Sequence, residues 1–131
     1  MQTKSSYVLS ERLKRMMPER QRSIVRSSEE LMSIMPELDK SLEELPPLYG
    51  QEKEGKNAII HAHYFLGDSD WYITEFDGID LMFGYVILNG DLQMSELGYI
   101  SLKDLLTVKN VELDFHWDKI TLAEMKKKRG I

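Results

Sequence analysis

Four short apolar runs decide the fold of this chain: AIIHAHYF (residues 58–65), WYITEFDG (71–78), LMFGYVIL (81–88) and ELGY (96–99). In the first two runs successive side chains are expected to point to opposite faces of a β-strand. The third run is almost wholly apolar, as in a central strand covered on both faces. Turn residues separate the runs, and Asp77-Gly78 favours a hairpin because glycine adopts the positive φ of tight turns. The pattern predicts an antiparallel sheet whose neighbouring strands follow chain order, since the turns are short.

The residues after these runs predict three more elements. Residues 102–106 form a short helix, and residues 111–117 alternate between apolar and polar as in a half-buried fifth strand. Thr121 is expected to cap a last helix, and Glu124 at the third helical position completes a capping box. The basic residues 126–129 then lie at the helix C-terminus, where the helix dipole favours cations.

The residues before the sheet predict helices. Leu9, Leu13 and Met16 recur at helical spacing, and Pro18 disfavours helix for the residue before it, so a break is expected there. Residues 19–34 form either one helix or two short ones, because residues 27–30 (SSEE) resemble a new N-terminus.

Pro36 is expected to end this helical region, with residues 39–45 forming a separate short helical turn. The fold class is therefore α+β. A helical segment packs on a roughly five-stranded, mostly antiparallel sheet, and a short C-terminal helix completes it. Residues 1–40 are assigned to a helical N-terminal extension and residues 41–131 to the sheet domain.

Composition excludes several classes of site. The 131 residues include no cysteine, so disulfides, thiolate metal sites and cysteine nucleophiles are excluded. No apolar run reaches the ~18 residues of a membrane span, and no secretory signal is recognised, so a cytoplasmic protein is expected. No phosphate-binding loop, dinucleotide motif or nucleophile elbow occurs, so no cofactor is expected.

Charge is unevenly distributed along the chain. The net charge is −5, but residues 1–26 carry +5 and residues 126–129 carry +4, which leaves −14 on the rest. The simplest interpretation is a solvated surface whose basic ends pair with an acidic body. The alternatives are a basic arm that contacts nucleic acid, or an acidic face that occupies a partner's nucleic-acid channel.

Five motifs occur in a fixed order: LPPLYGQE (45–52), WYITEFDG (71–78), Phe83-Gly84, ELGY (96–99) and Glu112-Leu113-Asp114. This series resembles a bacterial family known only as domain of unknown function 2958, and the resemblance covers about residues 42–125. It implies a small cytoplasmic bacterial protein, often encoded on plasmids, conjugative elements or prophages. It implies no activity, cofactor or site residue. The chain departs from the family at Phe65-Leu66-Gly67, where members show a Phe-Thr-Pro-like turn.

The first strand carries a histidine pair. Ile60, Ala62 and Tyr64 are expected on one face, and His61 and His63 on the other, about 7 Å apart. Histidines at this spacing could hold one edge of a metal site. The simpler interpretation is a pair of partly exposed polar residues, and no metal is expected.

Glu75, Asp77 and Glu96 form a set of acidic candidates. Carboxylates can act as general acid and base or hold a divalent cation, and Glu75 and Glu96 are the candidate catalytic residues. Glu75 stands out because it lies within an otherwise apolar strand, where a buried carboxylate needs a partner. The simpler interpretation is that Asp77 is a turn residue and that Glu75 pairs with a lysine or caps a loop.

Most aromatic residues are expected in the core, but Tyr49 and Trp71 are candidates to line a groove for a peptide or a base. With Glu75 and Asp77 they are the candidate binding residues of the sheet domain. In the helical segment, methionines at 16, 17, 32 and 35 either pack on the sheet or form a dimer or partner interface, with Arg15 and Arg22 beside it.

The leading functional prediction is a non-enzymatic, protein-binding accessory or anti-defence factor of a bacterial mobile genetic element. One alternative is a small acidic-site or metal-dependent enzyme that uses Glu75, Glu96 and the histidines. The other is nucleic-acid binding through the basic N-terminal arm. Residues 58–99 contain no lysine or arginine, which disfavours direct binding of nucleic acid by the sheet.

Overall fold

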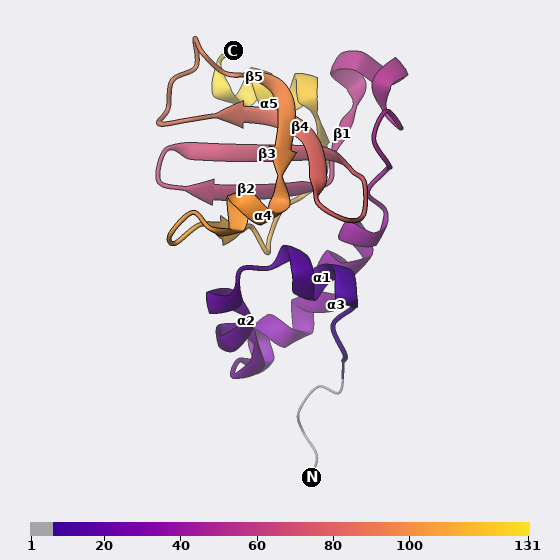
Figure 1. The fold of residues 1–131 in the computed structure, drawn as a ribbon, viewed down its shortest axis with the longest axis vertical. Helices are drawn as coiled ribbons and strands as arrows, with labels where there is room; N and C mark the ends of the chain where they lie inside the picture. The colour runs from indigo at the N-terminus through magenta and orange to yellow at the C-terminus, as the bar shows by residue number, and fades with distance from the viewer. Residues whose placement is uncertain (1–6) are drawn as a thin grey trace.

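The computed structural model describes residues 7–131, in which the helices nearest the N-terminus, α1 to α3, pack against one end of a sheet (Figure 1). The helices are α1 (Glu11–Met16), α2 (Glu19–Arg26), α3 (Glu29–Glu43), the 3-10 turn η1 (Glu52–Asn57), α4 (Leu102–Leu106) and α5 (Leu122–Arg129). No helix in this part of the chain is long and apolar enough to cross a membrane. The α+β class predicted from the sequence is confirmed.

Local caps set where the helices begin. Ser10 and Ser28 each accept a hydrogen bond from the backbone N–H three residues ahead, at the starts of α1 and α3. Residues 19–34 are therefore divided at Ser28, the second of the two alternatives. The capping box predicted for Thr121 and Glu124 is confirmed at the start of α5.

The prediction that Pro36 ends a helix is wrong, because α3 continues through it to Glu43 and absorbs most of the expected turn at 39–45. A proline inside a helix removes one backbone hydrogen bond. Met35, Leu38 and Leu42 nevertheless lie on one buried face that spans the proline. Burial of this face outweighs the lost bond, because tertiary packing supplies most of the stability of a helix in a protein.

The main sheet contains β2 (Ala62–Leu66), β3 (Ser69–Phe76), β4 (Leu81–Ile87), β5 (Glu96–Ser101) and β6 (Glu112–Leu113). All pairs are antiparallel, and the order is β5-β4-β3-β2-β6. Chain order is thus correct from β2 to β5 and wrong for β6, which pairs with β2 through Tyr64 and Leu113. After β5 the chain forms α4, which packs on one face of the sheet. It then continues to the edge opposite β5, where β6 pairs with β2.

The predicted first strand is interrupted at His61. The residues before it form a small second sheet, in which β1 (Ile59–Ile60) pairs with β7 (Ile120–Thr121). Ile60 packs in a different core cluster from Ala62 and Tyr64, so the prediction that these three residues share a face is wrong. A strict period of two holds only within one uninterrupted strand.

The predicted strand at 111–117 is reduced to Glu112–Leu113. The carboxylate of Asp114 accepts a hydrogen bond from the N–H of His116 at 3.0 Å, which turns the chain out of the sheet. The indole N–H of Trp117 donates to a backbone carbonyl of β1 at 2.9 Å. Alternation correctly indicated extended chain here, but side-chain hydrogen bonds end the pairing early.

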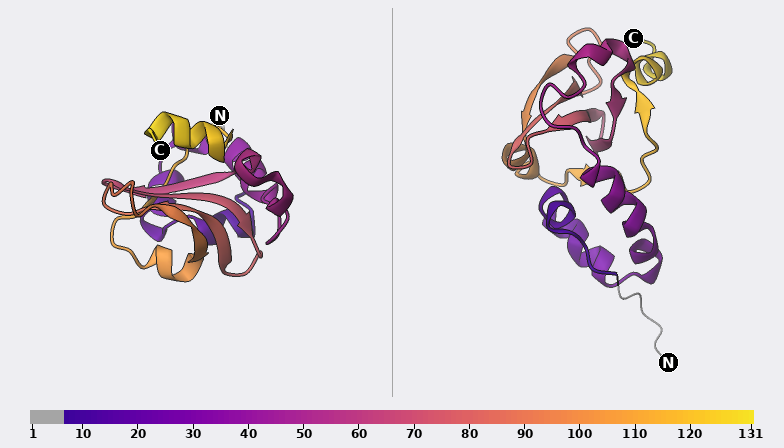
Figure 2. Two further views of the ribbon diagram at one scale, coloured as in Figure 1. Left: turned by 90° about the horizontal axis from the view of Figure 1, so that it is seen from above. Right: turned by 90° about the vertical axis from the view of Figure 1, so that its right-hand side faces the viewer.

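Two core clusters lie on opposite faces of the sheet, and seen from above the sheet runs between α5 and α4 (Figure 2, left). The larger cluster joins α1–α3 and α4 to one face, and the smaller joins α5 to the other. Leu13, Met16 and Met35 of the helical segment are fully buried in the larger cluster with Tyr64 of β2. The expected boundary after residue 40 falls inside α3, and one core extends across it.

Candidate functional site

Glu75, the acidic residue singled out in the second apolar run, is almost fully buried at the end of β3. Its carboxylate accepts hydrogen bonds from the backbone N–H groups of Tyr49, at 2.8 Å, and Gln51, at 2.9 Å. Glu75 therefore holds the loop that follows the two prolines, as in the simpler interpretation that it caps a loop. Tyr49 has a φ of 69°, and its side chain projects outwards with 65% of its surface exposed.

The side chain of Gln51 fixes the same loop to the neighbouring backbone. Its side-chain carbonyl accepts the N–H of Ile59 at 2.6 Å, and its amide donates to the carbonyls of Ile59, at 2.9 Å, and Thr74, at 2.7 Å. These bonds satisfy backbone groups where β3 and β4 shift register between Ile73 and Glu75. The loop is thus anchored at two neighbouring points, so Tyr49 is presented on a rigid base.

An aromatic groove of about 350 Å³ opens beside this loop. The residues that define it here are Tyr49, Glu52, Glu75, Phe83, Leu97 and Tyr99. The hydroxyl of Tyr99 donates to that of Tyr49 at 3.1 Å, and the rings of Phe83 and Tyr99 meet edge to face with centroids 5.1 Å apart. Tyr99 and Leu97 are 54% and 43% exposed, so the groove presents apolar surface to solvent.

The groove is negatively charged. Glu52 and Glu75 are the charged side chains among the described residues that line it. The hydrogen bond with Tyr49 raises the pKa of Tyr99, and the nearby carboxylates of Glu75 and Glu52 add to this effect. The site therefore combines exposed aromatic rings with an acidic rim.

The strand that carries Leu97 and Tyr99 is an open edge of the sheet. Among residues 7–131, β5 pairs only with β4, and Figure 2 (right) shows it as the outer strand. A Cβ placed on Gly98 would meet no atom within 4 Å, so the face of the sheet over Gly98 is also open. An edge strand offers unpaired N–H and C=O groups to another chain.

The opposite edge of the sheet is covered. The side-chain amide of Gln21 in α2 donates to the carbonyl of Leu113 at 3.1 Å and accepts its N–H at 2.8 Å. Gln21 is 6% exposed, so it acts as a short substitute for a neighbouring strand at β6. The contrast with β5 shows that only one of the two edges is left accessible within the described chain.

The structure places the other candidate binding residues away from the groove. Trp71 is buried in the larger core. Asp77 accepts hydrogen bonds from three backbone N–H groups of its own turn, which lower its pKa. Arg15 donates to the carbonyls of Gly78, at 3.0 Å, and of the residue that follows it, which fastens α1 to that turn. Arg22 donates to a carbonyl in α1 at 2.9 Å.

Glu75 and Glu96 are not brought together. In the sheet, Glu75 lies opposite Phe83, and Glu96 lies opposite Val86. Phe83 and Val86 are three residues apart in β4, so they point to opposite faces, about 10 Å apart along the strand. The two candidate catalytic carboxylates therefore do not share one site.

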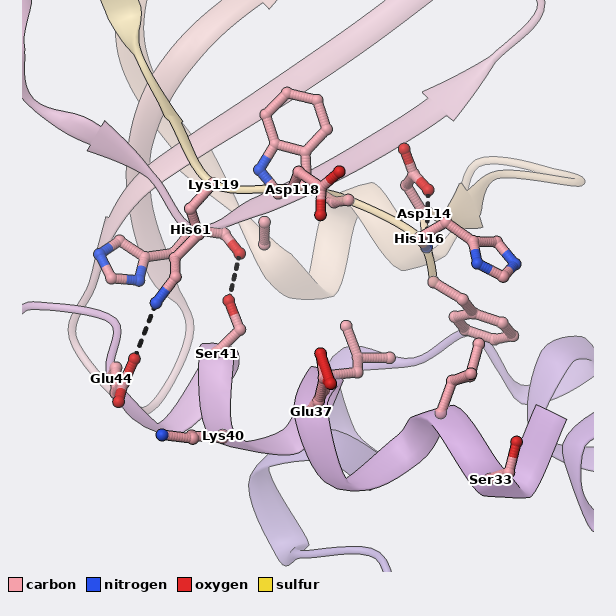
Figure 3. A pocket seen from close by; sticks show the side chains of 15 residues that line it. Ser33, Glu37, Lys40, Ser41, Glu44, His61, Asp114, His116, Asp118 and Lys119 are labelled. Carbon is pink, nitrogen blue, oxygen red and sulfur yellow. Dashed lines mark hydrogen bonds and ion pairs between the residues drawn. The ribbon is translucent and has the colours of Figure 1, made fainter.

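His61 lies in a separate cleft of about 860 Å³ between α3 and residues 114–119 (Figure 3). Its carbonyl accepts the hydroxyl of Ser41 at 3.0 Å, and an ion pair of Glu44 with Lys119, at 2.8 Å, lies nearby. His61 is 8% exposed, and the buried Nδ1 of its imidazole has no hydrogen-bond partner among the described residues. Burial, together with the positive charge of Lys119, lowers the pKa of His61.

His63 lies between two carboxylates. Its Nδ1 is 3.0 Å from Asp114 and its Nε2 is 2.7 Å from Asp70, while Arg129 of α5 bonds Asp70 at 2.8 Å. The imidazole stacks on Tyr72 with ring centroids 4.6 Å apart. Both ring nitrogens are thus engaged, and residues 7–131 contain no group of three or more side chains placed to hold a metal ion.

Sequence reasoning missed Phe83, Leu97 and Tyr99 as groove residues and assigned them to the core or to a motif. The signal that could have found them is the short run ELGYIS, in which a glycine separates two large apolar side chains on one face. Comparison with protein-family models, with curated proteins and with solved structures finds no match to this chain.

Proposed function

We propose that this chain is a cytoplasmic, protein-binding accessory or anti-defence factor of a bacterial mobile genetic element. The observation that carries protein binding is the aromatic groove beside the open β5 edge. Exposed tyrosines on a rigid base are typical of protein contacts, because their large rings lose little conformational entropy on binding. The association with mobile elements rests on the resemblance to domain of unknown function 2958.

The anchoring of the groove supports this proposal. Glu75 and Gln51 are buried, and their side-chain hydrogen bonds hold the loop that presents Tyr49. A preorganised surface loses less entropy when a partner binds than a mobile one does. The same bonds give Glu75 a positioning role that accounts for a carboxylate inside an apolar strand.

The test is a pull-down from host lysate that compares the wild type with Y49N/Y99T by mass spectrometry. Asparagine tolerates the positive φ at Tyr49, and threonine suits a strand, so the double variant is expected to fold. The control is I79T. Ile79 is 75% exposed, like the tyrosines, and lies outside the groove in the turn that holds α1. We expect a specific partner that the wild type and the control retain and the double variant loses. A partner that all three proteins retain equally would contradict the proposal.

A further inference from the structure

We infer that the β5 edge binds an extended, basic segment of the partner as a sixth strand of the main sheet. This inference rests on the proposed protein-binding function and specifies the chemistry of the partner. Addition of a strand to a sheet edge gains affinity from backbone hydrogen bonds and specificity from pockets for alternate side chains. The β5 edge offers both features.

The backbone of β5 is suited to receive a strand. In an antiparallel pair only alternate residues bond to the neighbour, so the remaining N–H and C=O groups of β5 point away from β4. Gly98 lies in the middle of the strand with no atom near the position of a Cβ. The edge contains no proline and no lysine, two of the residues with which proteins usually block such edges.

Two pockets flank the edge on opposite faces of the sheet. On one face, Leu97 and Tyr99 border the aromatic groove. On the other face, Glu96 borders a second hollow of about 400 Å³, which Val86 and Asp91 also line. Because successive side chains of a strand alternate between faces, an added strand would place its side chains in the two pockets in turn.

Charge selects the partner. The carboxylates are Glu52 and Glu75 in the groove and Asp91 and Glu96 in the hollow, and no lysine or arginine lines either pocket within the described chain. Lysine and arginine place an aliphatic stem on apolar surface while their charge meets a carboxylate. Leu97 and Tyr99 give the groove an exposed apolar surface, and the carboxylate of Glu75 is buried and bonded to the loop. The fitting segment therefore alternates apolar residues, directed at the groove, with lysine or arginine, directed at Glu96. A second copy of β5 would instead add carboxylates to an acidic edge, which disfavours it.

The first probe is a synthetic peptide of 6 residues, the length of β5, that alternates lysine with valine. Its control alternates glutamate with valine. We expect the lysine peptide to bind saturably and to weaken as salt rises, whereas the glutamate peptide binds at least roughly tenfold more weakly. Glu96→Gln should weaken the lysine peptide, and Glu19→Gln, an exposed acidic residue in α2, should not.

N-methylation of the lysine peptide distinguishes strand addition from other modes of binding. Methyl groups on every second backbone nitrogen remove either the donors that face β5 or those that face solvent. We expect one of the two methylation patterns to lower affinity roughly tenfold or more and the other to leave it nearly unchanged. Equal effects of both patterns, equal binding of the glutamate peptide, or a dimer in sedimentation that Y99T disrupts would overturn the inference.

The two proposals can fail separately. A lysate partner that Y49N/Y99T loses, combined with equal effects of both methylation patterns, would keep protein binding and reject strand addition. The opposite result is that only one methylation pattern weakens the peptide while the groove variant, Y49N/Y99T, retains the lysate partner. This result would keep the edge site and reject the proposed role of the groove in partner binding.

Discussion

Gly84 is the residue where the main sheet depends on the absence of a side chain. A Cβ at this position would lie 2.0 Å from the carbonyl oxygen of Tyr72 and 2.9 Å from its carbonyl carbon. Both are backbone atoms of the central strand β3, so neither can move without distorting the sheet. This close approach occurs next to the register shift between Ile73 and Glu75.

We predict that Gly84→Ala lowers the free energy of unfolding by about 2–4 kcal/mol, because the added methyl group overpacks a rigid site. The control is Gly98→Ala on β5, since Gly98 lies directly opposite Gly84 but has open space around its Cβ position. That control should change stability by less than about 0.5 kcal/mol. Denaturant unfolding of both variants checks the difference, and equal losses would contradict the argument.

At the scale of elements, the sequence predicts features that depend on near neighbours. The starts of α1, α3 and α5 could be predicted because a cap acts within three residues. The continuation of α3 through Pro36 could not, because it depends on a buried face formed with distant segments. The early end of the strand at 111–117 could not either, because the bonds of Asp114 and Trp117 compete with pairing.

The candidate site follows the same rule. Tyr49 could be proposed from its exposed-looking loop, and Glu75 from its place in an apolar run. Whether Phe83 in β4 and Leu97 and Tyr99 in β5 are covered depends on whether another element lies over this face of the sheet. The run ELGYIS indicates two large side chains on one face but not what covers them. Assignment of the aromatics Phe83 and Tyr99 to the core was reasonable for a covered sheet face, but Tyr99 lies on the edge strand β5 and is 54% exposed.

The covered edge at β6 gives a prediction at the same scale. Gln21→Leu would leave the N–H and C=O of Leu113 buried without their partners. We predict a loss of about 2–4 kcal/mol in the free energy of unfolding, because each unsatisfied backbone group costs about 1–3 kcal/mol. Amide hydrogen exchange at Leu113 should accelerate. Gln93→Leu on an exposed loop is the control, and a similar effect there would contradict the argument.

At the scale of the whole molecule, the His63 network ties distant segments together. His63 in β2 and Asp70 in β3 are joined to Asp114 after β6 and to Arg129 near the end of α5. Burial alone would lower the pKa of His63, but the hydrogen bonds with Asp114 and Asp70 outweigh it and the pKa is raised. The histidine and arginine lower the pKa of Asp70 against the opposing effect of its burial.

These shifts define a window of pH. A raised pKa means that the contribution of His63 to stability is fully present below its ordinary value of 6.5 and is lost as pH rises through the folded-state value. The lowered pKa values of Asp70 and Asp114 mean that their contribution is present above 3.8 and is lost as pH falls through their folded-state values. The network therefore stabilises the fold most between these two limits. His61, with its lowered pKa, opposes His63 in this range because it penalises the folded state at acid pH.

Substitution of His63 separates its effect from that of His61. We predict that His63→Gln is destabilised relative to the wild type most strongly at about pH 5.5, and that the difference shrinks towards about pH 8.5 as the wild-type histidine loses its proton. The measurement is the free energy of unfolding in urea across that range. His116→Gln keeps the backbone N–H that bonds Asp114 and removes only the weaker attraction between the exposed imidazole and that carboxylate, so it should change the profile much less than His63→Gln. A difference between His63→Gln and the wild type that stays constant with pH would mean that His63 contributes packing on Tyr72 and Trp117 but no charge-dependent link between the sheet and α5.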